Sequence, residues 1–191
     1  CELEDNYVSL NFGNTYFSLE NCKKIGYIRE DIEKKYINNF INEREKSILI
    51  TSLLYAMDRI ANTCGHYDAY IMKGSLDKEL KLEMLEVATY SQNELNQIYC
   101  EDTNQLVRKI SADMVYIDPP YNSRQYCDAY HLLENIATWK KPEVYGVARK
   151  MDRSHLKSKY CSKSAPNQFM DLIDNIQAKY ILVSYNNMGC K

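Results

Sequence analysis

The chain has 191 residues, of which 45% are hydrophobic, so it has the length of one ordinary domain and enough apolar side chains for a core. This composition excludes an intrinsically disordered chain. Because 24 Lys and Arg stand against 26 Asp and Glu, the formal charge of -2 excludes a global positive field, and any nucleic-acid surface must be local.

No segment reaches the ~20 apolar residues of a membrane span, and the first ten residues lack the features of a signal peptide. We therefore expect a cytoplasmic protein with no membrane partner. The 7 cysteines contain no CxxC pair, so we expect free thiols and no metal site.

Two amphipathic helices are predicted in the first part of the chain. Apolar residues recur at spacings of three and four over residues 19–41, where Ser18 and Asn21 are candidate caps, and again over residues 43–62. Residues 66–97 show no sustained period and are expected to be irregular.

From residue 98 onward, short apolar segments alternate with helical ones. The predicted elements are a strand at 98–100, a helix at 103–110, a strand at 114–117, helices at 130–139 and 168–177 on either side of a basic loop at 140–166, and a strand at 180–184. Strands that alternate with helices predict an α/β fold with a parallel sheet. We expect a helical region at 1–97 and part of an α/β core at 98–191.

The most informative string is VYIDPPYNSRQY, at residues 115–126. Asp118 follows a predicted strand, at the edge where α/β sheets place their ligand sites. Pro119 and Pro120 have fixed φ angles and no amide donors, so their carbonyls are free to face a ligand. A planar base with an amino group would fit, because Asp118 and the Pro119 carbonyl can accept its two hydrogens while Tyr121 stacks on the ring. The alternative is a simple strand-ending turn.

The run DPPYNSRQY at 118–126, followed by YHLLENIA at 130–137, resembles the catalytic motif of S-adenosylmethionine-dependent DNA adenine methyltransferases. The resemblance implies a Rossmann-like methyltransferase sheet in which Asp118, Pro119, Pro120 and Tyr121 are catalytic. It also implies S-adenosylmethionine as the cofactor, double-stranded DNA with a flipped adenine as the substrate, and a cognate restriction endonuclease as a partner. Methylation of cytosine or RNA, and a catalytically silent nucleic-acid-binding protein, remain alternatives.

The cofactor side of the resemblance is incomplete. The string IYCEDTNQLV at 98–107 resembles the family segment whose acid lies beside the adenine of S-adenosylmethionine, and Asp102 occupies the matching position; Asp102 is equally a candidate helix cap. The family's F-x-G-x-G turn is not found, because the string NFGN at 11–14 has one glycine and no buried strand before it. We expect half a cofactor site, and no turnover by this chain alone.

Several residues are candidate DNA contacts. Asn122, Arg124 and Tyr126 follow the motif closely enough to touch the flipped nucleotide or fill the gap it leaves, unless they pack locally. The loop after the second helix offers further groups suited to DNA, namely Asn62, Tyr67, Tyr70 and Lys73.

A local basic segment lies after the motif. Residues 140–163 carry eight Lys and Arg and two acidic residues, Glu143 and Asp152. This excess would neutralise phosphates, although a merely solvated loop is an equal alternative. His131 is expected to be structural rather than a catalytic base, because methyl transfer from a sulfonium needs no strong base.

Overall fold

The structure, a computed structural model, describes residues 3–87 and 95–186. The chain forms two compact units, one combining Cys1–Val87 with Tyr126–Ser154 and the other combining Ala88–Gln125 with His155–Lys191. Each unit is therefore assembled from two separate stretches, whereas the sequence predicted one division between residues 97 and 98. No helix within the described stretches is long and apolar enough to cross a bilayer.

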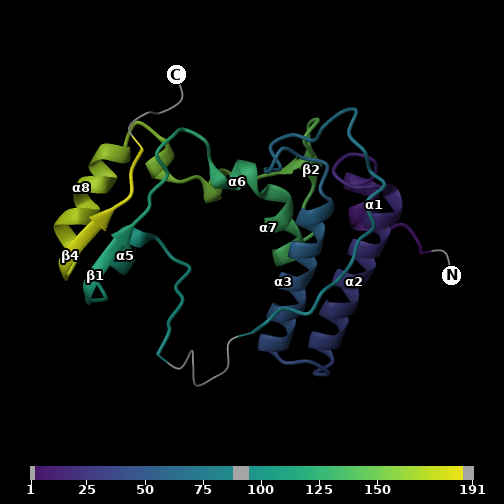
Figure 1. Ribbon diagram of the computed structural model, residues 1–191, viewed down its shortest axis with the longest axis horizontal. Coiled ribbons are helices and arrows are strands. Elements are labelled where there is room, and N and C mark those ends of the chain that lie inside the picture. Colours follow the sequence, from purple (N-terminus) through teal and green to yellow (C-terminus); the bar gives the residue numbers. More distant parts are fainter. Residues whose placement is uncertain (1–2, 88–94, 187–191) are drawn as a thin grey trace. The chain divides into compact units, whose positions relative to one another are not determined.

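The first unit is mainly helical (Figure 1). Its elements are α1 (Tyr7–Phe12), α2 (Leu19–Ile37), α3 (Glu43–Ile60), α6 (Tyr126–Ala129), α7 (His131–Thr138) and the short antiparallel pair of β2 (Val144–Tyr145) and β3 (Lys150–Met151). The helices α2 and α3 confirm the two predicted helices, and both end earlier than predicted. Ser18 is the cap of α2, where its side chain accepts the Asn21 amide at 3.2 Å.

The core of the first unit draws on both stretches of the chain. Phe12, Ile25 and Leu53 from the first three helices pack with Leu132 and Ile136 from α7. Because Phe12 ends a helix and is buried, the NFGN string is not a strand followed by a cofactor turn, as its single glycine indicated. The helix α7 confirms the predicted helix over residues 130–139 and completes this core.

A buried arginine joins α2 to the end of α7. Arg29 is 1% exposed, and its guanidinium donates to the carbonyls of Ile136 (2.9 Å) and Ala137 (3.2 Å) and to Glu33 (2.7 Å). It also lies 5.2 Å from the centre of the Trp139 ring. The last carbonyls of a helix have no partner within the helix, so Arg29 supplies the donors that α7 lacks.

His131, the first residue of α7, lies in a buried polar cluster. Its Nε2 donates to the Tyr67 carbonyl at 2.8 Å, which fixes the proton on Nε2 because a carbonyl only accepts. The Tyr16 hydroxyl lies within donating distance of the same carbonyl (2.8 Å) and of the Ala148 carbonyl (2.9 Å). Burial, opposed by the bond to Tyr67, lowers the pKa of His131 to about 4. His131 is therefore a neutral structural residue, as expected.

The second unit is a small α/β layer. Its elements are α5 (Thr103–Leu106), β1 (Ala112–Ile117), the 3-10 turn η2 (Lys159–Cys161), α8 (Ala165–Asn175) and β4 (Ala178–Val183). The strands β1 and β4 are parallel, with Met114 opposite Tyr180 and Ile117 opposite Val183. The predicted parallel sheet is therefore present, and α8 is the helix that directly precedes β4.

Two predicted elements of this unit differ from the structure. Residues 98–100 are not a strand: Ile98 is 95% exposed, and no neighbouring strand pairs with this segment in the described part of the chain. The predicted helix at 103–110 is reduced to Thr103–Leu106, after which a turn leads into β1. Short apolar runs form strands only where a partner supplies the hydrogen-bond ladder, and a single sequence does not show that partner.

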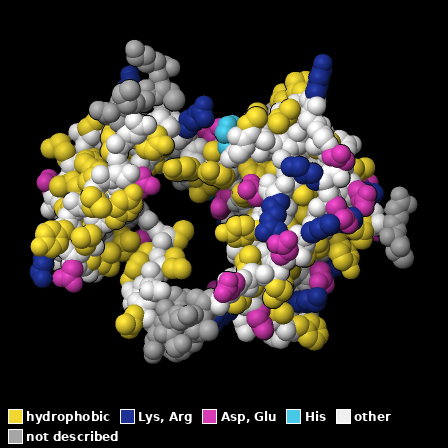
Figure 2. Space-filling model, in the orientation of Figure 1, with side chains coloured by type: hydrophobic (Ala, Val, Ile, Leu, Met, Phe, Trp, Pro, Cys, Tyr) yellow, Lys and Arg dark blue, Asp and Glu magenta, His cyan; other side chains and the backbone are white. Residues whose placement is uncertain are grey.

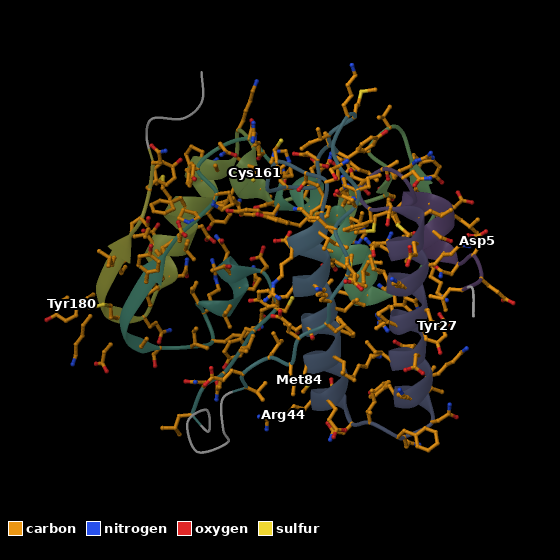
Figure 3. The ribbon with its side chains drawn as sticks, turned by 45° about the vertical axis from the view of Figure 1, so that its right-hand side comes forward. Asp5, Tyr27, Arg44, Met84, Cys161 and Tyr180 are labelled. Atoms are coloured by element: carbon orange, nitrogen blue, oxygen red, sulfur yellow. The ribbon has the colours of Figure 1, made fainter. Side chains whose placement is uncertain are left out.

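The two faces of the β1–β4 sheet differ in burial. Val115 and Ile117 pack with Leu172 of α8 in a small core, whereas Met114, Tyr116, Tyr180 and Leu182 are exposed. Figure 2 shows hydrophobic side chains over the region of β1 and β4, and Tyr180 projects away from its strand in Figure 3. One apolar sheet face is therefore open to solvent in this unit.

Candidate active site

The motif loop begins where β1 ends. The Ser184 amide donates to the Ile117 carbonyl at 2.9 Å, so the pairing of β4 with β1 continues up to the motif. Asp118 is exposed, and Tyr121 is 44% exposed, whereas Pro119 is buried. This arrangement follows from the strand register, which carries the chain to the carboxyl edge of the sheet and leaves Asp118 just beyond it.

The acceptor groups at the start of this loop are unpaired within the described part of the chain. Among the described residues, Asp118 has no hydrogen-bond or ion-pair partner, and nothing donates to the Pro119 or Pro120 carbonyl. An exposed carboxylate and two unpaired carbonyls are acceptors without donors. They suit a ligand that brings N–H groups, which is what the sequence predicted for an amino-bearing base.

A cavity of about 490 Å³ adjoins Pro119 and Pro120. Its walls are apolar or aromatic and come from η2, α8 and the end of β4: Tyr160, Ala165, Pro166, Phe169, Val183 and Tyr185. The volume is within the range of small-molecule sites, and flat apolar walls suit a planar ring. These residues were not predicted as site residues, although the position of Tyr185 just past a predicted strand was a usable signal, because parallel strands end at one edge.

A smaller cavity of about 280 Å³ reaches Asp118 itself. It also touches Pro119 and Pro120, and its remaining lining comes from α5, β1, α8 and the segment before η2: Thr103, Val107, Val115, Tyr116, Ile117, Ser158, Tyr160, Leu172 and Ile176. Asp118 and the prolines therefore border open space, whereas Tyr121 lines neither of these two cavities.

Asp102 is the N-cap of α5. Its carboxylate accepts the Gln105 amide at 3.1 Å, which confirms the capping role considered for it. Burial of the Tyr160 side chain, reinforced by the negative charges of Asp102 and Asp171, raises the Tyr160 pKa. Capping occupies one carboxylate oxygen and leaves Asp102 exposed, so a second, ligand-binding role stays a prediction.

The candidate contacts that follow the motif are accessible. Asn122 folds back to accept the Arg124 amide at 2.9 Å, and Arg124 is exposed. Tyr126 is exposed and stacks on Tyr130 with ring centres 6.0 Å apart. These residues therefore make local contacts and are still accessible to solvent. Their contact with DNA stays a prediction.

The loop after α3 gives a different result. Asn62 is 7% exposed, and its amide donates to the carbonyls of Thr15 (2.9 Å) and Ile71 (2.8 Å). Tyr67 is 1% exposed, and its hydroxyl donates to Asp58 at 3.2 Å. The structure does not support direct DNA contact by Asn62 or Tyr67, because their polar groups hold this loop together inside the protein. Lys73 is exposed and stays a candidate.

The cations of the basic segment at 140–163 are not all available to DNA. Three of its cations are used in ion pairs within the first unit: Lys141 with Glu30, Lys150 with Asp68, and Arg153 with Asp128. The exposed remainder is divided, with Lys140 and Arg149 in the first unit and Lys157, Lys159 and Lys163 in the second. Formal charge along the chain therefore overstated the positive surface available to DNA. In the described stretches, no group of three His, Cys, Asp or Glu could hold a metal ion.

The chain is similar to several curated methyltransferases. It is 41% identical over 175 residues to modification methylase StsI of Streptococcus sanguinis, covering 91% of this chain and 27% of that protein. It is 40% identical to type II methyltransferase M.FokI of Planomicrobium okeanokoites, again over 91% of this chain and 27% of the relative. It is 40% identical to type II methyltransferase M.NlaIII of Neisseria lactamica, over 91% of this chain and 52% of the relative.

The chain thus spans about a quarter to a half of the length of these relatives. No solved structure matches it significantly. The family model for D12 class N6 adenine-specific DNA methyltransferases matches residues 3–189, which is nearly the whole chain and includes the Asp118 loop. This chain therefore belongs to the D12 class of N6 adenine-specific DNA methyltransferases.

Proposed function

We propose that this protein transfers a methyl group from S-adenosylmethionine to the exocyclic amine of an adenine that has been flipped out of double-stranded DNA. The observation that carries the proposal is the free acceptor set at the end of β1: the Asp118 carboxylate and the Pro119 carbonyl, next to an apolar cavity of about 490 Å³. Membership of the family and similarity to modification methylases support the same reaction.

The chemistry follows from the two acceptors. The lone pair of an adenine amino group is delocalised into the ring, so the nitrogen is a poor nucleophile. Asp118 and the Pro119 carbonyl accept its two hydrogens and favour a pyramidal nitrogen whose lone pair is directed at the methyl carbon. When the donor is bound, the N–C bond would form as the S–C bond of the sulfonium breaks and leaves a neutral thioether, and the extra proton would pass from the nitrogen through the Asp118 carboxylate to water. Tyr121, with its exposed ring, stacks on the base.

The residues near Asp102 fit the adenine end of the methyl donor. The Asp102 carboxylate is exposed, and the smaller cavity is lined by Thr103, the first residue of the helix that Asp102 caps, and by Tyr160 and Asp118. Asp102 would accept a hydrogen bond from the adenine amine of S-adenosylmethionine, and Tyr160 would cover the adenine ring. S-adenosylmethionine supplies an electrophilic methyl group when bound.

The proposal also covers the type of sheet, the DNA contacts and the biological setting, which go beyond membership of the family. We place the β1–β4 pair in a Rossmann-like methyltransferase sheet, with the motif loop at its carboxyl edge. Asn122, Arg124, Tyr126 and Lys73 are the exposed candidates for DNA contact. The biological setting is restriction-modification in the cytoplasm, with a cognate restriction endonuclease that the methylation protects against.

The test is transfer of tritiated methyl groups to DNA by the protein expressed from its complete reading frame. Asp118→Ala should lower the rate at least about 100-fold, because it removes an acceptor used in the transition state. Asp113→Ala is the matched control, since Asp113 is an exposed carboxylate at the opposite end of β1, where it pairs with Lys179 at 3.3 Å. Digestion of the product to nucleosides should yield N6-methyladenine.

Three outcomes would contradict this proposal. Transfer that survives Asp118→Ala would exclude the proposed site. Methylcytosine as the product, or transfer to RNA in preference to DNA, would correct the substrate. DNA binding without any transfer by the wild-type protein would favour a silent nucleic-acid-binding protein.

A further inference from the structure

Tyr160 lies between the two cavities at the motif and lines both of them. Its hydroxyl donates to Asn104 Oδ1 of α5 at 2.7 Å, with the Gln168 carbonyl of α8 as a second acceptor at 3.2 Å. Asn104 is itself buried, and its amide donates to Asp171 at 2.7 Å and to the Gln168 carbonyl at 2.9 Å. The Tyr160 hydroxyl is therefore held by Asn104, whose own side chain is buried and hydrogen-bonded.

The residues on either side of Tyr160 are attached to the far end of the motif loop. The Ser158 amide donates to Gln125 Oε1 at 2.8 Å, and Gln125 Nε2 donates to the Ser158 carbonyl at 3.1 Å. The Cys161 thiol, in the segment labelled in Figure 3, donates to the Arg124 carbonyl at 3.2 Å. The segment from Ser158 to Cys161 therefore fixes the loop that begins at Asp118, after the prolines and Tyr121.

We infer that Tyr160 is a positioning residue for methyl transfer: it connects the end of the Asp118–Gln125 loop to α5, the helix that Asp102 caps. The inference rests on the proposed function for the identity of the reaction. One ring then forms a common wall for both cavities and sets the separation between them. Because the reacting groups must align within a fraction of an ångström, small displacements of this wall would reduce the rate without removing any ligand contact.

Tyr160→Phe tests the inference, because it keeps the ring and removes only the hydroxyl. Tyr180→Phe is the matched control, since Tyr180 is an exposed tyrosine of the same unit whose hydroxyl has no hydrogen-bond partner among the described residues. Gln125→Ala releases the loop from its other attachment and should act in the same direction as Tyr160→Phe.

Two measurements are made on each variant. In NMR spectra, Tyr160→Phe should shift the backbone amides of Tyr121 to Gln125 as well as those of Thr103 and Asn104, and Tyr180→Phe should shift neither group. In methyl transfer, Tyr160→Phe should lower kcat about tenfold, with KM for S-adenosylmethionine and for DNA within about twofold of wild type.

Amide shifts confined to α5 and α8 would overturn the inference, as would an unchanged kcat or a rise in KM without loss of kcat. The spectra decide the structural link even if wild-type protein transfers no methyl group, an outcome that would instead contradict the proposed function. Loss of the fold in Tyr160→Phe would overturn a specific positioning role, because that role requires a native structure in which only the loop has moved.

Discussion

Acid should destabilise the first unit through His131. This side chain is 1% exposed, its Nε2 proton is bonded to the Tyr67 carbonyl, and its Nδ1 is buried with no partner among the described residues. A second proton would place a charge at Nδ1 in this enclosed space, close to the cations of Lys150 and Arg153. The negative charge of Asp68 favours the protonated imidazole and offsets part of the cost of this charge, but the cost of burying the charge is larger.

The sign and size of the effect follow from proton linkage. The pKa of His131 falls from 6.5, the ordinary value expected in the unfolded chain, to about 4 in the folded protein. Between these two values the unfolded state binds more protons, so the free energy of unfolding rises with pH. This contribution is complete above pH ~6.5 and is lost as the pH falls toward ~4, and it amounts to about 3 kcal/mol.

The assay is urea unfolding at a series of pH values from about 4 to about 7.5, followed by a signal from the first unit. Carboxylates also titrate in this pH range and change the free energy of unfolding. The wild type is therefore compared with His131→Gln, which can still donate to the Tyr67 carbonyl but does not titrate. The wild type should lose about 3 kcal/mol more than the variant across the window. His155→Gln controls for loss of a histidine at an exposed position. Equal pH dependence in wild type and His131→Gln would refute the reasoning.

Two further substitutions test the other buried polar groups of this unit. Arg29→Met should cost about 3 kcal/mol in urea unfolding, because it leaves two carbonyls of α7 without their donor and removes one of the two cations that pair with Glu33, and Lys34→Met at an exposed position of the same helix should cost under about 0.5 kcal/mol. A cost below about 1 kcal/mol for Arg29→Met would contradict the role assigned to it. Asn62→Ala should cost about 2 kcal/mol in unfolding yet leave the DNA affinity of the folded protein unchanged, whereas exposed Lys73→Ala should weaken DNA binding without loss of stability. Loss of affinity by folded Asn62→Ala would restore it as a DNA contact.

The features that could be predicted from sequence are those encoded locally. Helical periodicity gave α2 and α3, the serine before α2 gave its cap, and the apolar runs gave β1 and β4. The motif was recognisable because Asp118 and two prolines directly follow an apolar strand. Its position at the carboxyl edge of a parallel sheet is the position expected from that pattern.

The features that could not be predicted depend on partners distant in sequence. Asn62 and Tyr67 have the side chains of DNA contacts, and only their distant partners show that they are structural. Lys150 and Arg153 contributed to a predicted basic patch, and only the fold brings Asp68 and Asp128 to them. Arg29 passed unnoticed for the same reason, since the carbonyls that it binds lie more than a hundred residues away.

The interleaving of the two units has a consequence for the order in which the protein becomes stable. Leu132 and Ile136 belong to the same core as Phe12 and Leu53, so α1, α2 and α3 lack part of their core until α7 has been synthesised. Ribosome-bound chains that end near residue 125 should therefore be sensitive to proteases in α1, α2 and α3, and protection of these helices should appear only once residues beyond 139 have emerged. Because the Asp118 loop is made before that point, it is translated while the core of the helical unit is still incomplete.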